Sequence, residues 1–152
     1  MNPGGEAESF DSFYAREFRP QVRRAVLLVG SNDAANDVVH DAFVRLYPRW
    51  GSLENPGGYL NRSVLNGARD HARRSAVRSR ALPRLVDPGS EEPVDYLDDA
   101  LMALPFNHRA ALVLRYVVGL TTAEIAHELE CAPGSVGPWI DRAMRQLRKA
   151  LR

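Results

Sequence analysis

The chain has 152 residues, a hydrophobic fraction of 45% and a formal net charge of +1, which suits one domain or two small ones with an apolar core. No apolar run approaches the roughly 20 residues that a membrane-spanning helix needs, and the single cysteine excludes an intramolecular disulfide. Residues 1–9 are polar and acidic and lack the basic start and apolar stretch of a signal peptide. These features predict a cytoplasmic protein without membrane insertion and with a disordered N-terminal segment over residues 1–9.

The charges are strongly segregated along the chain. Residues 10–80 carry twelve arginines against seven acids, residues 81–100 carry one arginine against six acids, and residues 101–152 carry seven basic residues against four acids. Two basic segments separated by an acidic one indicate two modules that face polyanions, connected by a tether.

Two amphipathic helices are expected first. Apolar residues recur at helical spacing over residues 10–29, and Gly30 ends the run. Pro20 lies inside this stretch and predicts a kink or a division into two helices. Ser31 is the expected N-cap of the next helix, and Pro48 is expected to end or bend that helix. The polar side of this second helix carries Asp37, His40, Asp41 and Arg45.

A turn-rich stretch and a long basic helix follow. Residues 51–58 end in Asn-Pro-Gly-Gly and predict a loop. Residues 59–80 have the helical period, with Leu60, Val64 and Leu65 on the apolar side. The other side of this helix carries Arg62, Asn66, Arg69, Arg73 and Arg74.

The chain changes character after residue 80. Residues 81–95 are rich in proline and acids, which is typical of a linker. Helical patterning resumes at Tyr96, and Pro105 begins a further helix that Gly119 ends. No strand alternation of useful length is present. The predicted fold is therefore all-α, with two small helical domains, an N-terminal bundle and a C-terminal helix-turn-helix, joined by a flexible linker.

The C-terminal segment has the pattern of a helix-turn-helix. Thr121 and Glu124 form a capping box that starts a short helix, and Pro133-Gly134 breaks it. A longer helix follows, with apolar residues at helical spacing from Val136 onward and basic residues on its other faces. This arrangement can place the second helix in the DNA major groove, although an ordinary helical hairpin with solvated arginines has the same pattern.

No residue pattern points to catalysis or to a metal. His127 and Cys131 lie four residues apart, but two ligands do not make a structural zinc site, and Cys131 alone is typical of a small buried residue. We find no nucleophile–base pair, phosphate loop or metal constellation in the sequence. We therefore expect a protein that is not an enzyme and that needs no cofactor or metal.

Residues 10–152 resemble the extracytoplasmic-function (ECF) group of bacterial sigma-70 RNA polymerase sigma factors, in particular the small SigE-like type of actinobacteria. Residues 37–46 match the family's Asp-x-x-Gln-(Glu/Asp)-x-Phe-x-(Arg/Lys)-(Leu/Ala) helix, with His40 in place of the usual glutamine. In the family this helix docks on the β′ clamp helices of the polymerase. The resemblance implies that Asp37, His40, Asp41 and Arg45 form that surface, and a plain solvated face is the alternative.

Residues 59–70 are similar to the family's helix that recognises and melts the −10 promoter element. Capture of a flipped base needs aromatic or apolar platforms beside cations. The residues implied are Trp50, Tyr59, Arg62, Asn66, Arg69, Arg73 and Arg74. Asn66 is the expected base reader, with a local hydrogen bond to the backbone as the alternative. For Trp50 and Tyr59 the alternative is packing in the core.

Residues 104–126 carry the strongest match, to the family's region 4, whose second helix-turn-helix helix reads the −35 element. This chain departs from the family there, because Gly137 and Pro138 stand where a lysine and a serine are usual, and Trp139 replaces an arginine. Fewer cations at the helix start predict weaker binding with a flatter salt dependence. Because Pro138 fits best in a first turn, we expect the helix to begin near Ser135. The implied −35 residues are Ser135, Trp139, Arg142, Arg145 and Arg148, and a protein contact is the alternative for Trp139.

The resemblance implies a division into a region 2 domain at residues 10–80, a linker at residues 81–95 and a region 4 domain at residues 96–152. The acidic linker then threads toward the RNA exit path, with a solubilising tether as the alternative. The implied partners are core RNA polymerase (β′ clamp helices and β flap), promoter DNA and, as is common in the family, an anti-sigma factor. Two other functions stay open: a stand-alone helix-turn-helix regulator, and a degenerate sigma-like protein that binds polymerase or an anti-sigma factor without initiating.

Overall fold

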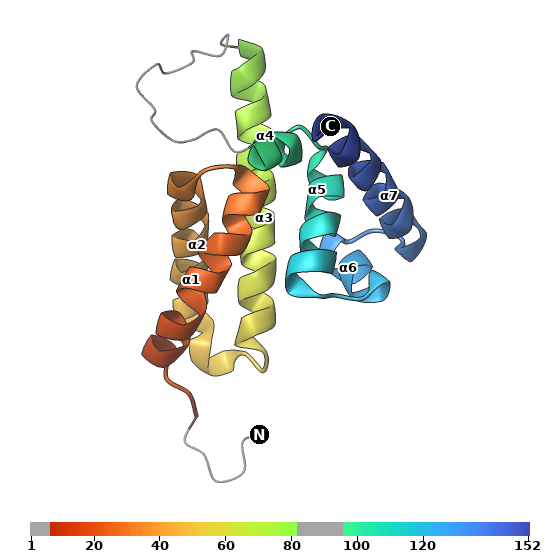
Figure 1. Cartoon of the computed structure of the whole chain (residues 1–152). Coiled ribbons are helices and arrows are strands. Elements are labelled where there is room, and N and C mark those ends of the chain that lie inside the picture. Colours follow the sequence, from red (N-terminus) through yellow and green to blue (C-terminus); the bar gives the residue numbers. More distant parts are fainter. Residues whose placement is uncertain (1–6, 82–95) are drawn as a thin grey trace.

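The computed structural model describes residues 7–81 and 96–152, and all of the regular structure in these ranges is helical (Figure 1). Of the expected linker at residues 81–95, Ala81 is the last residue of α3, and residues 82–95 lie outside the described residues, as do residues 1–6. The elements are α1 (Phe10–Val29), α2 (Asn32–Leu46), the 3-10 helix η1 (Tyr47–Ser52), α3 (Pro56–Ala81), α4 (Tyr96–Met102), α5 (Phe106–Val113), the π-helical segment η2 (Leu114–Val118), α6 (Thr122–Leu129) and α7 (Pro133–Ala150). We call α1–α3 the N-terminal unit and α4–α7 the C-terminal unit.

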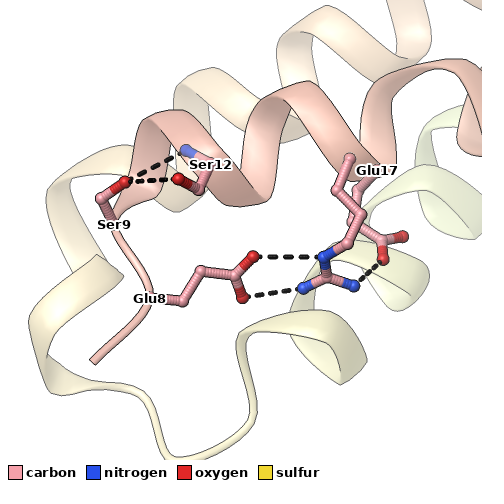
Figure 2. Close-up of polar contacts among 5 residues, drawn as sticks. Glu8, Ser9, Ser12 and Glu17 are labelled. Carbon is pink, nitrogen blue, oxygen red and sulfur yellow. Dashed lines mark hydrogen bonds and ion pairs between the residues drawn. The ribbon is translucent and has the colours of Figure 1, made fainter. Parts of the chain in front are cut away.

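Helix α1 is held at its start by side chains that precede it. The Ser9 hydroxyl accepts a hydrogen bond from the Ser12 amide at 3.1 Å, which is an N-cap (Figure 2). Glu8 and Glu17 both pair with the guanidinium of Arg16, at 2.8 and 2.6 Å (Figure 2). Residues 8 and 9 of the segment expected to be disordered therefore contact the first helix.

The expected break at Pro20 is not formed, because α1 runs as one helix from Phe10 to Val29. Proline has no amide donor, so it removes one hydrogen bond from the helix and destabilises it. Burial of side chains on the following turns can offset this cost. Gln21, directly after the proline, is buried and donates to the Asn61 side chain of α3 at 2.5 Å. Ala25 and Leu28 continue the same buried face. Packing against α3 thus accompanies a helix that continues through Pro20 without a break.

Helices α1, α2 and α3 pack side by side as a three-helix unit (Figure 1). Ser31 caps α2 as expected, since its hydroxyl accepts from the Ala34 amide. Gly67 lets α2 and α3 approach closely, because a Cβ placed there would lie 3.1 Å from Val38 Cγ1. The apolar residues predicted for these helices form the buried core of this unit.

The turn between α2 and α3 is more ordered than expected. Residues 47–52 form a 3-10 helix, and α3 begins at Pro56 rather than at Tyr59. Proline is favoured at a first helical position, and the Asn55 side chain accepts a hydrogen bond from the Gly58 amide at 3.0 Å. The residues that suggested a loop therefore start the helix.

The start of the helix-turn-helix follows the sequence prediction. Gly119 adopts a left-handed φ of 86° and ends the helical segment. Thr121 and Glu124 form the expected capping box, with hydrogen bonds of 3.2 and 3.0 Å. Not expected are the π-helical residues 114–118 before Gly119 and the left-handed φ of 54° at Glu130.

The predicted start of α7 near Ser135 is wrong. The helix begins at Pro133, with Ala132 as N-cap, and Pro138 lies inside it. The reason is that Pro133 has the fixed φ and missing donor that suit a first helical position, so the helix starts one half-turn earlier. The Ser135 amide then donates to the Ala132 carbonyl at 2.9 Å.

The two units share one continuous hydrophobic core. The buried apolar cluster runs from Phe13 in α1 through Leu101 and Leu104 to Ala143 in α7. Helices α4 and α5 both contact α1, and α4 also contacts α7 (Figure 1). The described chain is therefore two helical units packed against each other.

Candidate nucleic-acid and polymerase interfaces

Helix α2 carries an exposed face that matches the predicted polymerase-docking residues. Asp37, His40, Asp41 and Arg45 are all exposed, at positions i, i+3, i+4 and i+8 of one helix. The opposite face is buried through Val38, Val39, Ala42, Phe43 and Leu46. The structure thus brings the four predicted residues together on one surface.

One residue of this face was missed from the sequence. Val44 lies at position i+7 of the same row and is 57% exposed. An exposed valine among charged residues gives the face an apolar centre, which is typical of a surface that binds a protein. Its helical position beside Asp41 and Arg45 is the sequence signal that could have identified it.

Helix α3 aligns most of the predicted −10 residues in one row. Tyr59, Arg62, Asn66, Arg69 and Arg73 follow each other at steps of three and four residues. Arg74 is exposed next to this row. Among the described residues the exposed Asn66 side chain has no hydrogen-bond partner, so the local backbone bond considered as an alternative is not formed. Asn66 lines a cavity of about 620 Å³ with Tyr59 and Arg62.

The two aromatic residues predicted to stack on bases are both partly buried. Trp50 packs in an aromatic cluster, with its ring centroid 5.6 Å from that of Phe10 and 4.9 Å from that of Phe13. Tyr59 packs against the core, and the Arg49 guanidinium lies 5.0 Å from its ring centroid. Core packing, the alternative considered for both, is therefore formed in this structure.

Helix α7 separates an apolar face from a basic one. Val136, Ile140 and Ala143 are buried, whereas Arg142, Arg145 and Arg148 are exposed. Ser135 is half-buried. Trp139 is half-buried too, with its ring centroid 6.1 Å from that of His108 in α5. Trp139 is thus in contact with another part of the protein.

Two titratable groups near α7 have shifted pKa values. Burial, and then the charge of Arg142, lower the pKa of His108 from its ordinary value. Burial raises the pKa of the half-buried Cys131 thiol. Among the described residues no three metal-ligating side chains converge, and no helix is both long and apolar enough to cross a bilayer.

Comparison with known proteins identifies the two units. The family model described as Sigma-70 region 2 matches residues 14–78, and the one described as Sigma-70, region 4 matches residues 95–147. The RNA polymerase sigma-E factor of Streptomyces coelicolor is 30% identical over 97% of this chain and 88% of its own. The ECF RNA polymerase sigma factor SigM of Mycobacterium tuberculosis is 29% identical over 97% of this chain and 79% of its own.

The chain belongs to the ECF group of sigma-70 family sigma factors. A solved structure of the sigma factor RpoE from Bartonella quintana, in complex with the anti-sigma factor NepR, has a TM-score of 0.73 and 22% identity. It covers 93% of this chain and 96% of its own, which confirms the all-α sigma fold. The function of the chain is accordingly that of an ECF sigma factor in promoter recognition and transcription initiation, and sigma factors as a family are not enzymes.

Proposed function

We propose that this sigma factor docks on core RNA polymerase through the exposed row of α2 formed by Asp37, His40, Asp41, Val44 and Arg45. The observation that carries the proposal is the exposure of all five residues on one face whose reverse side is buried. The mixed charges of the row can fix the orientation of a bound partner, and its exposed valine adds apolar contact area. The partner surface that the family resemblance indicates is the β′ clamp.

The row on α3 is proposed to hold the −10 element. Three arginines, Arg62, Arg69 and Arg73, supply phosphate contacts along a single strand, and Asn66 offers an unpaired amide to a base edge. The 620 Å³ cavity beside Asn66 provides room for an extruded base. Tyr59 at its edge is the aromatic platform in this proposal.

Helix α7 is proposed to bind the −35 element through its exposed arginines Arg142, Arg145 and Arg148. Gly137 and Pro138 are exposed near its start and contribute no charge, so the phosphate contacts lie toward the C-terminal half of the helix. Fewer cationic contacts lower the affinity of α7 for the −35 element and make this binding less dependent on salt. The −10 contacts then carry a larger share of promoter specificity.

Two further partners belong to the proposal. The β flap is the partner of the C-terminal unit that the family resemblance implies. An anti-sigma factor is the second, motivated by the complex of the Bartonella quintana sigma factor with NepR. The bond-forming chemistry of transcription belongs to the polymerase in this assignment.

The experiment that tests the proposal is run-off transcription with purified core polymerase and a fragmented genomic library, with the start sites mapped. Asp41→Arg should abolish both co-elution with polymerase and transcription, because it reverses a charge in the centre of the α2 row. Asp11→Arg is the matched control, since Asp11 is also an exposed acid of the N-terminal unit but lies on α1, outside the row.

The outcomes separate the three candidate functions. Discrete start sites with a shared upstream motif, lost in Asp41→Arg and kept in Asp11→Arg, support the proposed docking. Co-elution without transcripts points to a degenerate sigma-like protein. Neither co-elution nor transcripts, with binding to duplex DNA retained, points to a stand-alone regulator.

A further inference from the structure

A cavity of about 680 Å³, which we call the basic cavity, lies between α3 and the C-terminal unit. Its volume is in the range of cavities that bind small molecules. None of the lining residues that the structure describes is acidic. One wall belongs to α3 and is basic, and the other belongs to the C-terminal unit and is largely aromatic. The residues of the two walls that matter here are Arg69, His71 and Arg73 on α3 and Phe106, His108 and Trp139 opposite them.

The basic wall presents two guanidinium groups to the cavity. Arg73 is exposed and Arg69 is half-buried, and within the described residues neither has an acidic partner. The two lie four residues apart on α3 and therefore share one face of the helix. Guanidinium groups bind phosphate oxygens through paired N–H donors, so two of them on one face suit a ligand with successive phosphates.

The aromatic wall suits a flat ring. The ring centroid of Trp139 lies 6.1 Å from that of His108, with an angle of 32° between the ring planes. Burial, and then the charge of Arg142, lower the pKa of His108, so its ring is uncharged at neutral pH. Nucleobases stack on aromatic side chains of this kind. A phosphate alone would leave this wall without a contact.

A buried arginine fixes the ring that joins the two walls. The Phe106 ring centroid lies 5.5 Å from the guanidinium of Arg69 and 5.4 Å from that of Arg109, both within cation–π range. Arg109 is only 3% exposed and donates to the carbonyls of Leu28 and Leu104, at 3.0 and 2.9 Å. Its donors are thus used by the backbone, and its role at the cavity is structural.

Other contacts hold the remaining side of the cavity. Met102, which also lines it, rests on the end of α1, because a Cβ built on Gly30 would lie 2.9 Å from Met102 Cγ. Gln146 of α7 donates to the Ala103 carbonyl just after α4, at 3.4 Å. A cavity built by such contacts is preformed, so a ligand needs little further ordering of the protein when it binds.

We propose that the basic cavity binds a nucleotide with two or more phosphates, whose phosphates pair with Arg69 and Arg73 and whose base packs against Trp139 and His108. An inorganic anion would use only the basic wall, and an uncharged ring only the aromatic wall. A double helix cannot enter a cavity of this volume between helices that contact each other.

The proposed site has a consequence for promoter binding. Arg69 and Arg73 also belong to the α3 row proposed to hold the −10 element, so a bound nucleotide and the −10 strand exclude each other. This consequence rests on the proposed function of the row, whereas binding of the nucleotide does not. The cavity would then let a small molecule lower the affinity of the sigma factor for its promoter.

The test uses the full-length Trp50→Phe protein, in which Trp139 is the remaining tryptophan. Quenching of its fluorescence by GTP or ATP reports binding beside Trp139, and isothermal titration calorimetry on wild type measures the affinity independently. Guanosine and inorganic tripolyphosphate present the base and the phosphates separately. The titrations are made at about 0.15 M salt, where attraction between distant exposed charges is largely screened.

Arg73→Gln and Arg74→Gln are the matched variants. Both residues are exposed neighbours on α3, but Arg73 lines the cavity and Arg74 does not. Because both substitutions lie on the surface, we expect both proteins to fold, and circular dichroism checks that they keep their helices.

We expect GTP or ATP to quench Trp139, and guanosine and tripolyphosphate each to bind at least about tenfold more weakly, since each meets one wall only. Arg73→Gln should weaken binding of the triphosphate about tenfold, as is typical when a hydrogen bond to a charged group is lost. Arg74→Gln should leave the affinity unchanged.

Three results would overturn the nucleotide site. The first is that neither GTP nor ATP quenches Trp139 or gives a binding isotherm. The second is that tripolyphosphate binds as tightly as the nucleotides, and the third is that both variants lose the same affinity. In the last two cases the binding would be a general attraction of anions to a basic surface.

Displacement of a labelled single strand of randomised sequence, followed by fluorescence anisotropy, tests the shared use of Arg69 and Arg73. We expect GTP to release the strand and guanosine not to. A strand that stays bound while Trp139 is quenched would overturn the shared use. Run-off transcription separates the two proposals: start sites without nucleotide binding remove only the nucleotide site, and nucleotide binding without start sites removes only the proposed function.

Discussion

At the scale of single residues, position in a helix decides what each side chain can do. Asp37, His40 and Asp41 are exposed because they lie opposite the buried valines of α2. Arg109 belongs to the same residue type as Arg62 but is buried, since it lies where the carbonyl ends of two helices converge. Its type and position were visible in the sequence, whereas the Leu28 carbonyl that it binds belongs to a helix 81 residues away in the chain.

His108 gives a prediction on pH. Burial and the nearby charge of Arg142 lower its pKa in the folded state, so between that value and the unfolded value of about 6.5 the unfolded chain binds more protons. The free energy of unfolding should therefore fall as the pH drops through about 6.5, and level off below the folded pKa. Urea unfolding at a series of pH values between about 5 and 8 measures this slope.

His108→Gln should flatten this part of the pH profile, because the group that takes up the proton is absent. Arg142→Gln should reduce the pH dependence of the free energy of unfolding only in part, since burial is the larger cause of the lowered His108 pKa. A slope that is the same in wild type and in His108→Gln would contradict the assignment.

At the scale of elements, local signals placed most helix ends. Gly30 and Gly119 both adopt a left-handed φ and end their helices, and the capping box at Thr121 starts α6. At the two prolines inside helices, the division of α1 at Pro20 and the late start of α7 set by Pro138 were wrong. In α1 the reason is tertiary, because the residues after Pro20 are buried against α3. In α7 it is local, because Pro133 offers an earlier start.

Gly30 and Gly119 form a matched pair for an element-scale prediction. Alanine at either position must adopt a left-handed conformation, at a cost of about 1–2 kcal/mol. Only at Gly30 would the new methyl group also meet Met102, whereas nothing lies within 4 Å at Gly119. Gly30→Ala should therefore destabilise the protein by a further ~1 kcal/mol, the lower end of the cost of overpacking.

Thermal unfolding measures both variants, with a change in Tm of about 2–4 °C per kcal/mol for a chain of this size. Gly30→Ala should also expand the molecule in solution, and Gly119→Ala should not. Equal losses of Tm would mean that Met102 moves aside without cost and that the contact between α1 and α4 is loose.

At the scale of the whole molecule, one core runs through both units. Each unit contains one of the two tryptophans, Trp50 in the N-terminal unit and Trp139 in the C-terminal unit. Trp50→Phe and Trp139→Phe therefore give single-tryptophan proteins that report on one unit each. Because the units share buried contacts, we expect the two proteins to unfold in coincident urea transitions.

Adding Met102→Glu to each single-tryptophan protein should separate the two transitions, since it disrupts the contact between the units. Fluorescence during urea unfolding measures both midpoints. Separate midpoints already in the proteins with Met102 intact would mean that the units fold independently and that the shared core contributes little to stability.

The helices, their apolar faces and the residues on their polar faces can be predicted from the sequence, because these depend on spacing along the chain and on capping and turn residues nearby. The rows on α2 and α3 are of this kind. The packing of the helices against one another is what carries α1 through Pro20, places Trp50 and Tyr59 against the core, and brings Arg109 and Met102 to the contact between the units. Those outcomes depend on contacts between residues far apart in the chain, which no local pattern records.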